Sequence, residues 1–198
     1  AYRRVQEAYD KLTDFALVFE HACKSLKSLE ETSIHPGNPI KVMLFLKAKS
    51  IEEGFEAVGK KCLVDYKYDG FRMLINKDEK GEIRIFTRRL DNVTKQFPEV
   101  TDYVKKYVNG KTFILDSEAV GYDPKTFKYK PFQEISQRIK RKYNIEQLQE
   151  KLPVEINVFD IIYYNGKSLI KEQFKKRREI IEKIVKNTPG KIKVSKAI

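Results

Sequence analysis

The chain has 198 residues, and 41% of them are hydrophobic and 12% aromatic, which is enough apolar material for one sizeable domain with an appendage. The formal net charge of +12 favours a polyanionic partner such as nucleic acid, although a lysine-rich surface is also typical of thermophile proteins. The sequence shows no cysteine framework, no zinc-ligand spacing, no signal-peptide pattern and no run of about 20 apolar residues. We therefore expect a globular, intracellular protein that does not span a membrane.

Residues 1–34 are predicted to be helical. Apolar residues recur there at the three- and four-residue spacing of an amphipathic helix, namely Ala8, Leu12, Phe15, Phe19, Ala22 and Leu26. Asp14 is placed to cap a second helix. The chain starts inside this helical pattern, so we expect it to be part of a longer protein. Loop-forming residues at 35–39 end the pattern and predict a linker.

The remainder of the chain, residues 35–198, mixes strand and helix patterns without a regular β-α-β order. Strands are expected at 42–46, 62–66, 71–76, 82–87, 112–120, 154–164 and 191–198. Helices are expected at 50–58, 98–108, 132–139, 145–152 and 170–185. We predict an α+β fold of mixed or antiparallel sheets with flanking helices, preceded by a short all-α segment.

Lys67 stands between an apolar run and the turn-forming pair Asp69-Gly70. An Asp-Gly pair tolerates positive φ, so residues 62–66 and 71–76 are predicted to be the two strands of a hairpin. Alternation along a strand would place Asp65 and Lys67 on one face. From these residues alone, the pair is either an exposed ion pair of about 0–1 kcal/mol or an acceptor beside a reactive amine.

Three further segments each contain one side chain that has both a structural and a functional explanation. Arg88, beside Arg89, suits either a solvated turn or a phosphate-binding guanidinium. Glu118 lies in an apolar run, where a carboxylate either faces water at a sheet edge or is paired or metal-bound. Phe159 suits either the core or the stacking of a base on its ring. No P-loop sequence accompanies them.

Taken together, these segments resemble the motifs of a known family. Lys-Tyr-Asp-Gly-Phe-Arg at 67–72 resembles the K-x-D-G-x-R signature of covalent nucleotidyltransferases, which include DNA ligases, RNA ligases and mRNA capping enzymes. The segments 86–94, 113–120 and 158–166 resemble, in order, the arginine-bearing, "LDxEAV" and "FDxxYxNG" segments of archaeal and eukaryotic ATP-dependent DNA ligases. The conjunction of four ordered motifs is specific.

The resemblance implies a domain division and a fold. Residues 35–198 would form part of an adenylation domain with the ATP-grasp-like covalent nucleotidyltransferase fold. Residues 1–34 would be the C-terminal remnant of a helical DNA-binding domain. The family's "EGxxxK" segment, its later lysine motif and its oligonucleotide-binding domain do not occur in these 198 residues.

The resemblance also assigns roles to single residues. Lys67 would attack the α-phosphate of ATP, with Arg72 nearby and Arg88 on the phosphate and ribose side. Glu118 would contact the ribose or a catalytic metal ion. The ring of Phe159 would stack on adenine. Asp65 stands where the DNA ligases usually have a glutamate that accepts from the adenine amino group. The aspartate side chain is one methylene shorter, which puts that contact with the base in doubt.

ATP and Mg²⁺ are therefore the expected cofactors, and nicked double-stranded DNA the expected substrate, in DNA repair, replication or recombination. A sliding clamp is a further partner to consider, through a region before residue 1. The location would be the cytoplasm or nucleoid of an archaeon, or the nucleus of a eukaryote. Two alternatives remain open: a capping-type guanylyltransferase that uses GTP, and a catalytically silent nucleic-acid-binding module. The second would use a basic set made of Lys140, Arg141, Lys142, Lys175, Lys176 and Arg177.

Overall fold

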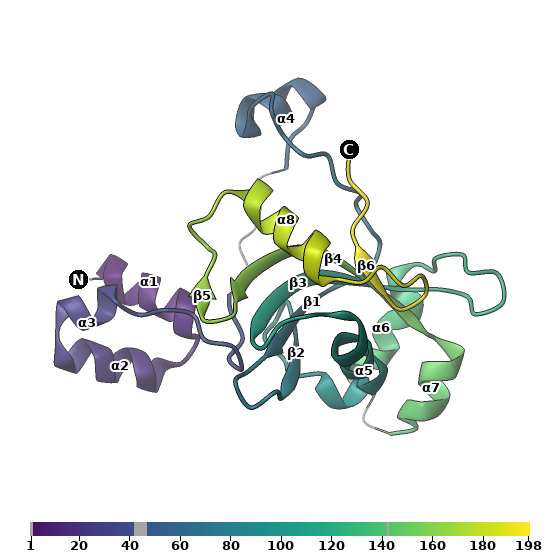
Figure 1. The fold of residues 1–198 in the computed structure, drawn as a ribbon, viewed down its shortest axis with the longest axis horizontal. Helices are drawn as coiled ribbons and strands as arrows, with labels where there is room; N and C mark the ends of the chain where they lie inside the picture. The colour runs from purple at the N-terminus through teal and green to yellow at the C-terminus, as the bar shows by residue number, and fades with distance from the viewer. Residues whose placement is uncertain (1, 42–46, 142) are drawn as a thin grey trace.

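The computed structural model of the protein describes residues 2–41, 47–141 and 143–198. A single sheet lies at its centre, the helices that follow β1 in the chain pack around that sheet, and the three N-terminal helices form a separate group to one side (Figure 1). The strand expected at 42–46 lies outside the described residues. Within those residues, no helix has the length and apolar character needed to cross a membrane.

The sheet has six strands and is largely antiparallel, in the order β2-β1-β3-β4-β5, with β6 added parallel to β4. The strands are β1 (Phe71–Lys77), β2 (Ile83–Thr87), β3 (Phe113–Gly121), β4 (Val154–Tyr164), β5 (Lys167–Ser168) and β6 (Ile192–Val194). The α+β prediction is therefore confirmed. The last strand is shorter than the expected 191–198, and beyond it Ala197 forms an isolated antiparallel bridge with Asp65.

Helices cover one face of this sheet and form the main core with it. They are α5 (Pro98–Tyr107), α6 (Phe132–Lys140) and α8 (Phe174–Ile184), with α7 (Ile145–Lys151) and the short 3-10 turn η1 (Thr94–Gln96) nearby. Met73, Leu115 and Ile156 are fully buried from the sheet side, against Val100 of α5 and Ile181 of α8. The expected helix at 170–185 begins four residues later than predicted.

The other face of the sheet is divided. Its apolar half packs against the segment before α4 in a second cluster of Ile34, Ile40, Leu74, Phe86, Ile114 and Tyr163. The predicted linker is therefore held on the sheet rather than being a free connection. Gly37 donates from its backbone N to Asn76 Oδ1 at 3.3 Å and accepts at its carbonyl from Arg84 Nη1 at 3.1 Å.

The N-terminal helices are α1 (Tyr2–Leu12), α2 (Phe15–Lys24) and α3 (Leu26–Glu30), with a small core of Ala8, Leu12, Val18 and Leu29. Asp14 caps α2 as predicted, because its Oδ1 accepts from the backbone N of Ala16 at 2.8 Å. The predicted apolar stripe is wrong beyond Leu12. Phe15 and Phe19 are 74% and 69% exposed, because the break at Thr13, with φ of 50°, restarts the helix in another phase.

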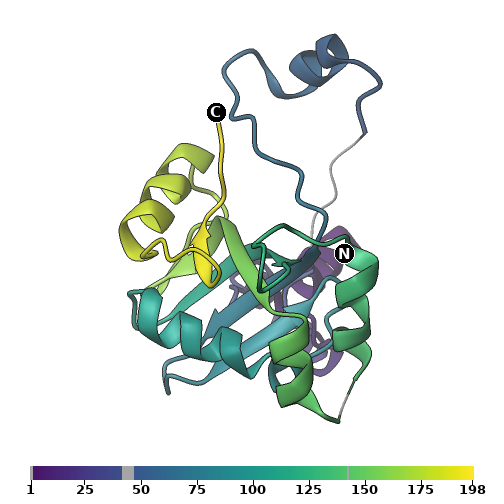
Figure 2. The same cartoon turned by 90° about the vertical axis from the view of Figure 1, so that its right-hand side faces the viewer.

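The helix α4 (Ile51–Val58) stands away from the sheet (Figure 1). Its start is the predicted one, since Ser50 Oγ accepts from the backbone N of Glu53 at 3.2 Å. The segment that follows returns to the body beside the C-terminal segment (Figure 2).

The hairpin predicted around Lys67 is wrong in its first strand. Residues 71–77 do form β1, but both edges of β1 are taken by β2 and β3. The segment before Lys67 pairs instead with the C-terminal residues: Val64 and Ile198 exchange both backbone hydrogen bonds at 2.9 Å. Outside the bridge at Asp65, this segment is not strand, so the argument that strand alternation puts Asp65 and Lys67 on one face does not hold.

Gly70 is required for a reason other than the predicted turn. Its φ is not in the positive region. A Cβ at this position would lie 2.3 Å from the carbonyl oxygen of Ala119, well inside van der Waals contact. Glycine therefore allows the Lys67 segment to cross close over β3.

Candidate active site

A row of polar side chains crosses the half of the sheet face that the N-terminal segment leaves uncovered. Register partners project to the same face of a sheet, and the row runs through Arg72 on β1, Glu118 on β3, Asn157 on β4 and Lys193 on β6. Asp116 and Asp160 form a second pair in register on the same face. Residues from four strands, β1, β3, β4 and β6, are thus brought to one surface.

Arg72 and Asp116 form an ion pair at the centre of this surface. Arg72 Nε donates to Asp116 Oδ1 at 2.7 Å, and Nη2 donates to the other carboxylate oxygen. The Asp116 side chain is only 6% exposed. Burial raises the pKa of its carboxyl, against the lowering effect of the guanidinium. The Arg72 guanidinium also lies 5.8 Å from the centre of the Phe159 ring, within cation–π range.

Glu118 is the half-buried carboxylate of the row. Burial raises its pKa to about 7, while the nearby cations Lys67 and Arg72 act in the opposite direction. Among the described residues, no hydrogen bond engages its carboxylate. Glu118 therefore lies between two cationic side chains with its oxygens available to a ligand.

Lys67 lies in the exposed segment that crosses over this row. Its Nζ donates to the carbonyl of Tyr68 at 3.3 Å. The segment is held directly after the lysine. Tyr68 packs edge-on against Tyr129 with ring centres 6.2 Å apart, and Asp69 Oδ2 accepts from the backbone N of Phe132 at 3.3 Å. The amine is thus presented from an anchored loop rather than from a strand.

Phe159 is turned by a bulge in β4. Asp116 pairs with Asp160 while Ser117 pairs with Val158, so Phe159 is the extra residue between them. Bulges change the direction of a side chain relative to the regular strand. The ring is part-exposed, in contrast to its fully buried neighbour Val158. The structure therefore does not place Phe159 in the core.

Asp65 and Arg88 lie at two sides of this surface. Asp65 Oδ2 accepts from Ser195 Oγ at 2.9 Å, and its Oδ1 accepts from the backbone N of Tyr66 at 2.8 Å. Arg88 is exposed in the turn after β2, one residue past the pairing of Thr87 with Met73. Arg88 therefore stands level with Arg72 but, among the described residues, makes no side-chain hydrogen bond or ion pair.

A family model described as an ATP dependent DNA ligase domain matches residues 42–198. The chain belongs to this ligase domain family. It is 42% identical over 193 residues to a DNA ligase of Nanoarchaeum equitans, covering 96% of this chain and 34% of that protein. It is 38% identical over 186 residues to a DNA ligase of Saccharolobus solfataricus, covering 92% of this chain and 30% of that protein. The chain thus spans about a third of these relatives.

Two solved ligase structures were also found to be similar to this ligase domain. One is the ligase domain from M. tuberculosis LigD, with a TM-score of 0.44 and 24% identity over 61% of this chain and 36% of that one. The other is mycobacterial DNA ligase D complexed with ATP and MES, with a TM-score of 0.47 and 22% identity over 68% of this chain and 39% of that one.

Several polar residues of this surface were not singled out from the sequence. Asn157 lies in the polar row fully buried, with both carboxamide atoms unpaired among the described residues. Asp160 accepts two hydrogen bonds from Arg177, at 2.8 and 2.9 Å. Polar residues within the apolar run of β4 were a signal that the sequence offered, but the sequence does not show which residues they contact. Arg177 was instead grouped with the free basic set, and the ion pair shows that grouping to be wrong.

The rest of that basic set is available to solvent. Lys140, Arg141, Lys175 and Lys176 are exposed, and Lys142 lies outside the described residues. These residues belong to the helices α6 and α8 or follow them directly. The end of α6 and the start of α8 therefore each carry exposed positive charge.

The carboxylates present fit a metal ion only in part. Within the described residues, no cluster of three or more histidine, cysteine, aspartate or glutamate side chains could hold one. Asp116 and Asp160 are already bound to arginines, which leaves Glu118. Mg²⁺ is commonly held by one or two carboxylates together with substrate phosphates, and a single free carboxylate suits that arrangement.

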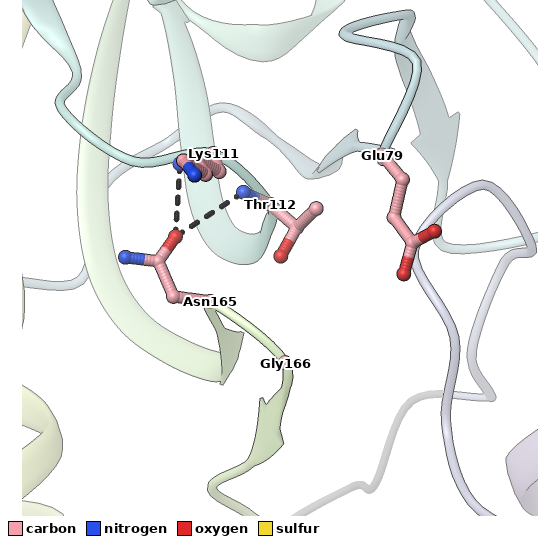
Figure 3. Close-up of a pocket in the computed structure, with 5 residues that line it drawn as sticks. All are labelled: Glu79, Lys111, Thr112, Asn165 and Gly166. Atoms are coloured by element: carbon pink, nitrogen blue, oxygen red, sulfur yellow. Dashed lines mark hydrogen bonds between the residues drawn. The ribbon is translucent and has the colours of Figure 1, made fainter.

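The pocket drawn in Figure 3 lies at the opposite end of the sheet and contains none of the predicted site residues. It is lined by Glu79, Lys111, Thr112, Asn165 and Gly166. Asn165 Oδ1 accepts from the backbone N of Lys111 at 2.8 Å and of Thr112 at 3.3 Å. The Asn-Gly end of the "FDxxYxNG"-like segment thus ties two loops together, at a distance from Phe159.

Proposed function

We propose that this chain is the main part of the adenylation domain of an ATP-dependent DNA ligase and that Lys67 becomes covalently linked to AMP. The observation that carries the proposal is the position of Lys67, which is anchored over a sheet surface bearing Arg72, Glu118 and the outward-turned Phe159. A nucleophilic amine, cations for phosphate and an aromatic platform for a base are thereby gathered in one place. Membership of the ligase domain family supports the same activity.

In this reaction the neutral amine of Lys67 attacks the α-phosphorus of ATP. The new bond is a phosphoramidate P–N bond, and the bond that breaks joins the α-phosphorus to the bridging oxygen of pyrophosphate. The pyrophosphate leaves with the electrons of that bond, and the nitrogen loses one proton to solvent and keeps the other as the phosphoramidate N–H. Positioning and electrostatic stabilisation supply most of the rate in phosphoryl chemistry of this type.

The other site residues would bind and orient the nucleotide. The part-exposed ring of Phe159 offers a stacking surface for adenine, and the carboxylate of Asp65 an acceptor for the adenine amino group. Glu118, whose carboxylate is free, would accept from a ribose hydroxyl or hold Mg²⁺, and the cation would neutralise phosphate charge when bound. Arg72 and Arg88, level with each other on neighbouring strands, would face the phosphates and the ribose.

The later steps belong to the whole protein. AMP would pass from Lys67 to the 5′-phosphate at a nick, and the 3′-hydroxyl would then displace it. The exposed basic side chains Lys140, Arg141 and Lys175 support contact with DNA phosphates. Helices α1 to α3, with a small core of their own, support the assignment of residues 1–34 to a helical DNA-binding domain and of 35–198 to the adenylation domain. A sliding-clamp partner and a nucleoid location in an archaeon complete the proposal.

The test is covalent labelling of the full-length parent protein with α-labelled ATP. We expect Lys67→Ala and Lys67→Arg both to abolish the labelled band, because guanidinium stays protonated and cannot replace the amine. Labelling by ATP in preference to α-labelled GTP would separate a ligase from a capping-type guanylyltransferase. A labelled band of normal intensity in either Lys67 variant would refute the proposal, and salt-dependent DNA binding by an unlabelled wild-type protein would favour the silent binding module.

A further inference from the structure

Two neighbouring arginines of α8 reach two different sides of the candidate site. Arg177 donates through Nε and Nη2 to the two carboxylate oxygens of Asp160, at 2.8 and 2.9 Å. Arg178 donates through Nη1 to Ser195 Oγ at 2.9 Å and through Nη2 to the Ser195 carbonyl at 2.6 Å. The two arginine side chains are only 16% and 13% exposed. Successive residues of a helix point about 100° apart, so one helix can serve both partners.

The Arg177 contact fixes the side of the site that carries Phe159. Asp160 is the residue after Phe159, at the bulge that turns the ring outward. Asp160 is also the register partner of Asp116, so two carboxylates face each other across β3 and β4. Arg72 binds one of them and Arg177 the other. Without Arg177, the like charges would repel at the position where the bulge must hold its shape.

The Arg178 contact fixes the side that carries Lys67. Ser195 has a single hydroxyl hydrogen, which it donates to Asp65 Oδ2 at 2.9 Å while its oxygen accepts from Arg178. Asp65 lies two residues before Lys67, in the segment whose Val64 exchanges backbone hydrogen bonds with Ile198. Figure 2 shows the C-terminal segment beside α8 and beside the segment that leads to β1. A continuous chain of hydrogen bonds therefore runs from α8 through Ser195 to Asp65.

We propose that Arg177 and Arg178 are positioning residues that hold the Phe159 side and the Asp65–Lys67 side of the site at a fixed separation, and so determine affinity and base selectivity for the purine nucleoside triphosphate. This inference depends on the proposed function, because it assumes that the nucleotide binds between the two sides. It also gives the two arginines a role inside the protein. Arg177 also donates to the carbonyl of Glu172, and Arg178 to the carboxylate of Glu182, so the remaining contacts of both side chains are likewise within the protein.

The experiment measures the rate of lysyl-AMP formation by the full-length protein against ATP concentration, without DNA. We expect Arg178→Ala to raise the half-saturating ATP concentration by roughly 10- to 100-fold, the loss associated with hydrogen bonds to a charged group, with a much smaller change in the maximal rate. Arg178→Lys should restore only part of the affinity, because lysine lacks the planar fork of donors. The control is Lys183→Ala, an exposed residue of the same helix that takes no part in the proposed DNA contact, which should behave as wild type.

A second comparison tests whether Arg178 acts on Asp65 through Ser195 or whether Arg178 and Ser195 act independently. If Arg178 acts through Ser195, then combining Arg178→Ala with Ser195→Ala should cost little more than Arg178→Ala alone, whereas independent effects would multiply. Arg177→Ala should reduce the preference for ATP over GTP, because it removes the ion pair that holds Asp160 and the bulge at Phe159 in place. Thermal unfolding of each variant shows whether it is folded at the assay temperature.

Three outcomes would overturn the inference. They are a wild-type half-saturating concentration in folded Arg178→Ala, a multiplicative effect in the double variant, and an unchanged preference for ATP over GTP in Arg177→Ala. If Arg178→Ala does not fold, Ser195→Ala decides the matter, since it removes one oxygen atom, and wild-type ATP affinity in that variant contradicts the relay. A wild-type protein that forms no lysyl-AMP would instead refute the proposed function, so the two failures are distinguishable.

Discussion

The two halves of one sheet face in this ligase domain have opposite characters although the same strands form both. In one half, Leu74 and Ile114 are buried under the segment that carries Ile34. In the other half, two to four residues along the same strands, Arg72 and Glu118 belong to a row of polar side chains. Burial on this face is therefore decided by what packs on the strands, and the uncovered half is where ligand chemistry is available.

The largest effect on activity expected from this contrast follows from breaking the ion pair at the centre of the polar half. Arg72→Met would leave the carboxylate of Asp116, 6% exposed, without its counter-charge. We expect the free energy of unfolding to fall by about 3 kcal/mol and covalent AMP formation to be lost. Urea titration and α-labelled ATP measure the two effects.

The control for Arg72→Met is Arg3→Met, because Arg3 pairs with Glu7 on the exposed surface of α1. Removing such a surface pair should change the free energy of unfolding by less than about 1 kcal/mol and should leave AMP labelling intact. Equal destabilisation by the two variants would contradict the distinction between the polar half and an ordinary surface.

A smaller effect concerns the pH dependence of stability. Burial raises the pKa of Glu118 from 4.5 to about 7, so the folded state holds this proton more tightly than the unfolded state does. The free energy of unfolding should therefore contain a contribution that is present at low pH and is lost as pH rises from 4.5 to about 7. Because the side chain is partly open to water, we expect about 1–2 kcal/mol.

Glu118→Gln removes that titration. The variant should gain stability relative to wild type between pH 4.5 and pH 7.5, and urea titrations of both proteins at the two pH values measure the change. If the stability difference between wild type and variant is the same at both pH values, the pKa of Glu118 is not raised in the folded protein.

The regular elements of the fold were largely predictable, because local signals determine them. Ser50 and Asp14 cap the helices that the sequence predicts, and the apolar runs of β3 and β4 are strands at almost the expected bounds. Pairing was less predictable. Nothing in the Asp69-Gly70 pair shows that both edges of β1 are taken, or that the segment before this pair forms hydrogen bonds with residues more than a hundred positions later.

The candidate site shows the same division. Lys67, Arg72, Glu118 and Phe159 were predicted because their segments resemble the ordered motifs of a known family. The residues that hold them in place, such as Ser195 and Arg178, have ordinary surroundings in the sequence, and only the fold brings them together. The bulge that turns Phe159 outward likewise depends on the register between two strands.

The measurement that tests the contrast most directly compares two phenylalanines of this sheet, Phe86 in the covered half and Phe159 in the polar half. Phe86→Ala should lower the free energy of unfolding by about 3–5 kcal/mol, as for a buried aromatic, and leave the ATP affinity of the folded protein unchanged. Phe159→Ala should weaken ATP binding by about 1–3 kcal/mol, as for the loss of base stacking, with a smaller effect on stability. Urea titration and calorimetric ATP titration of the full-length protein give both quantities. A folded Phe159→Ala variant with unchanged ATP affinity would contradict the account.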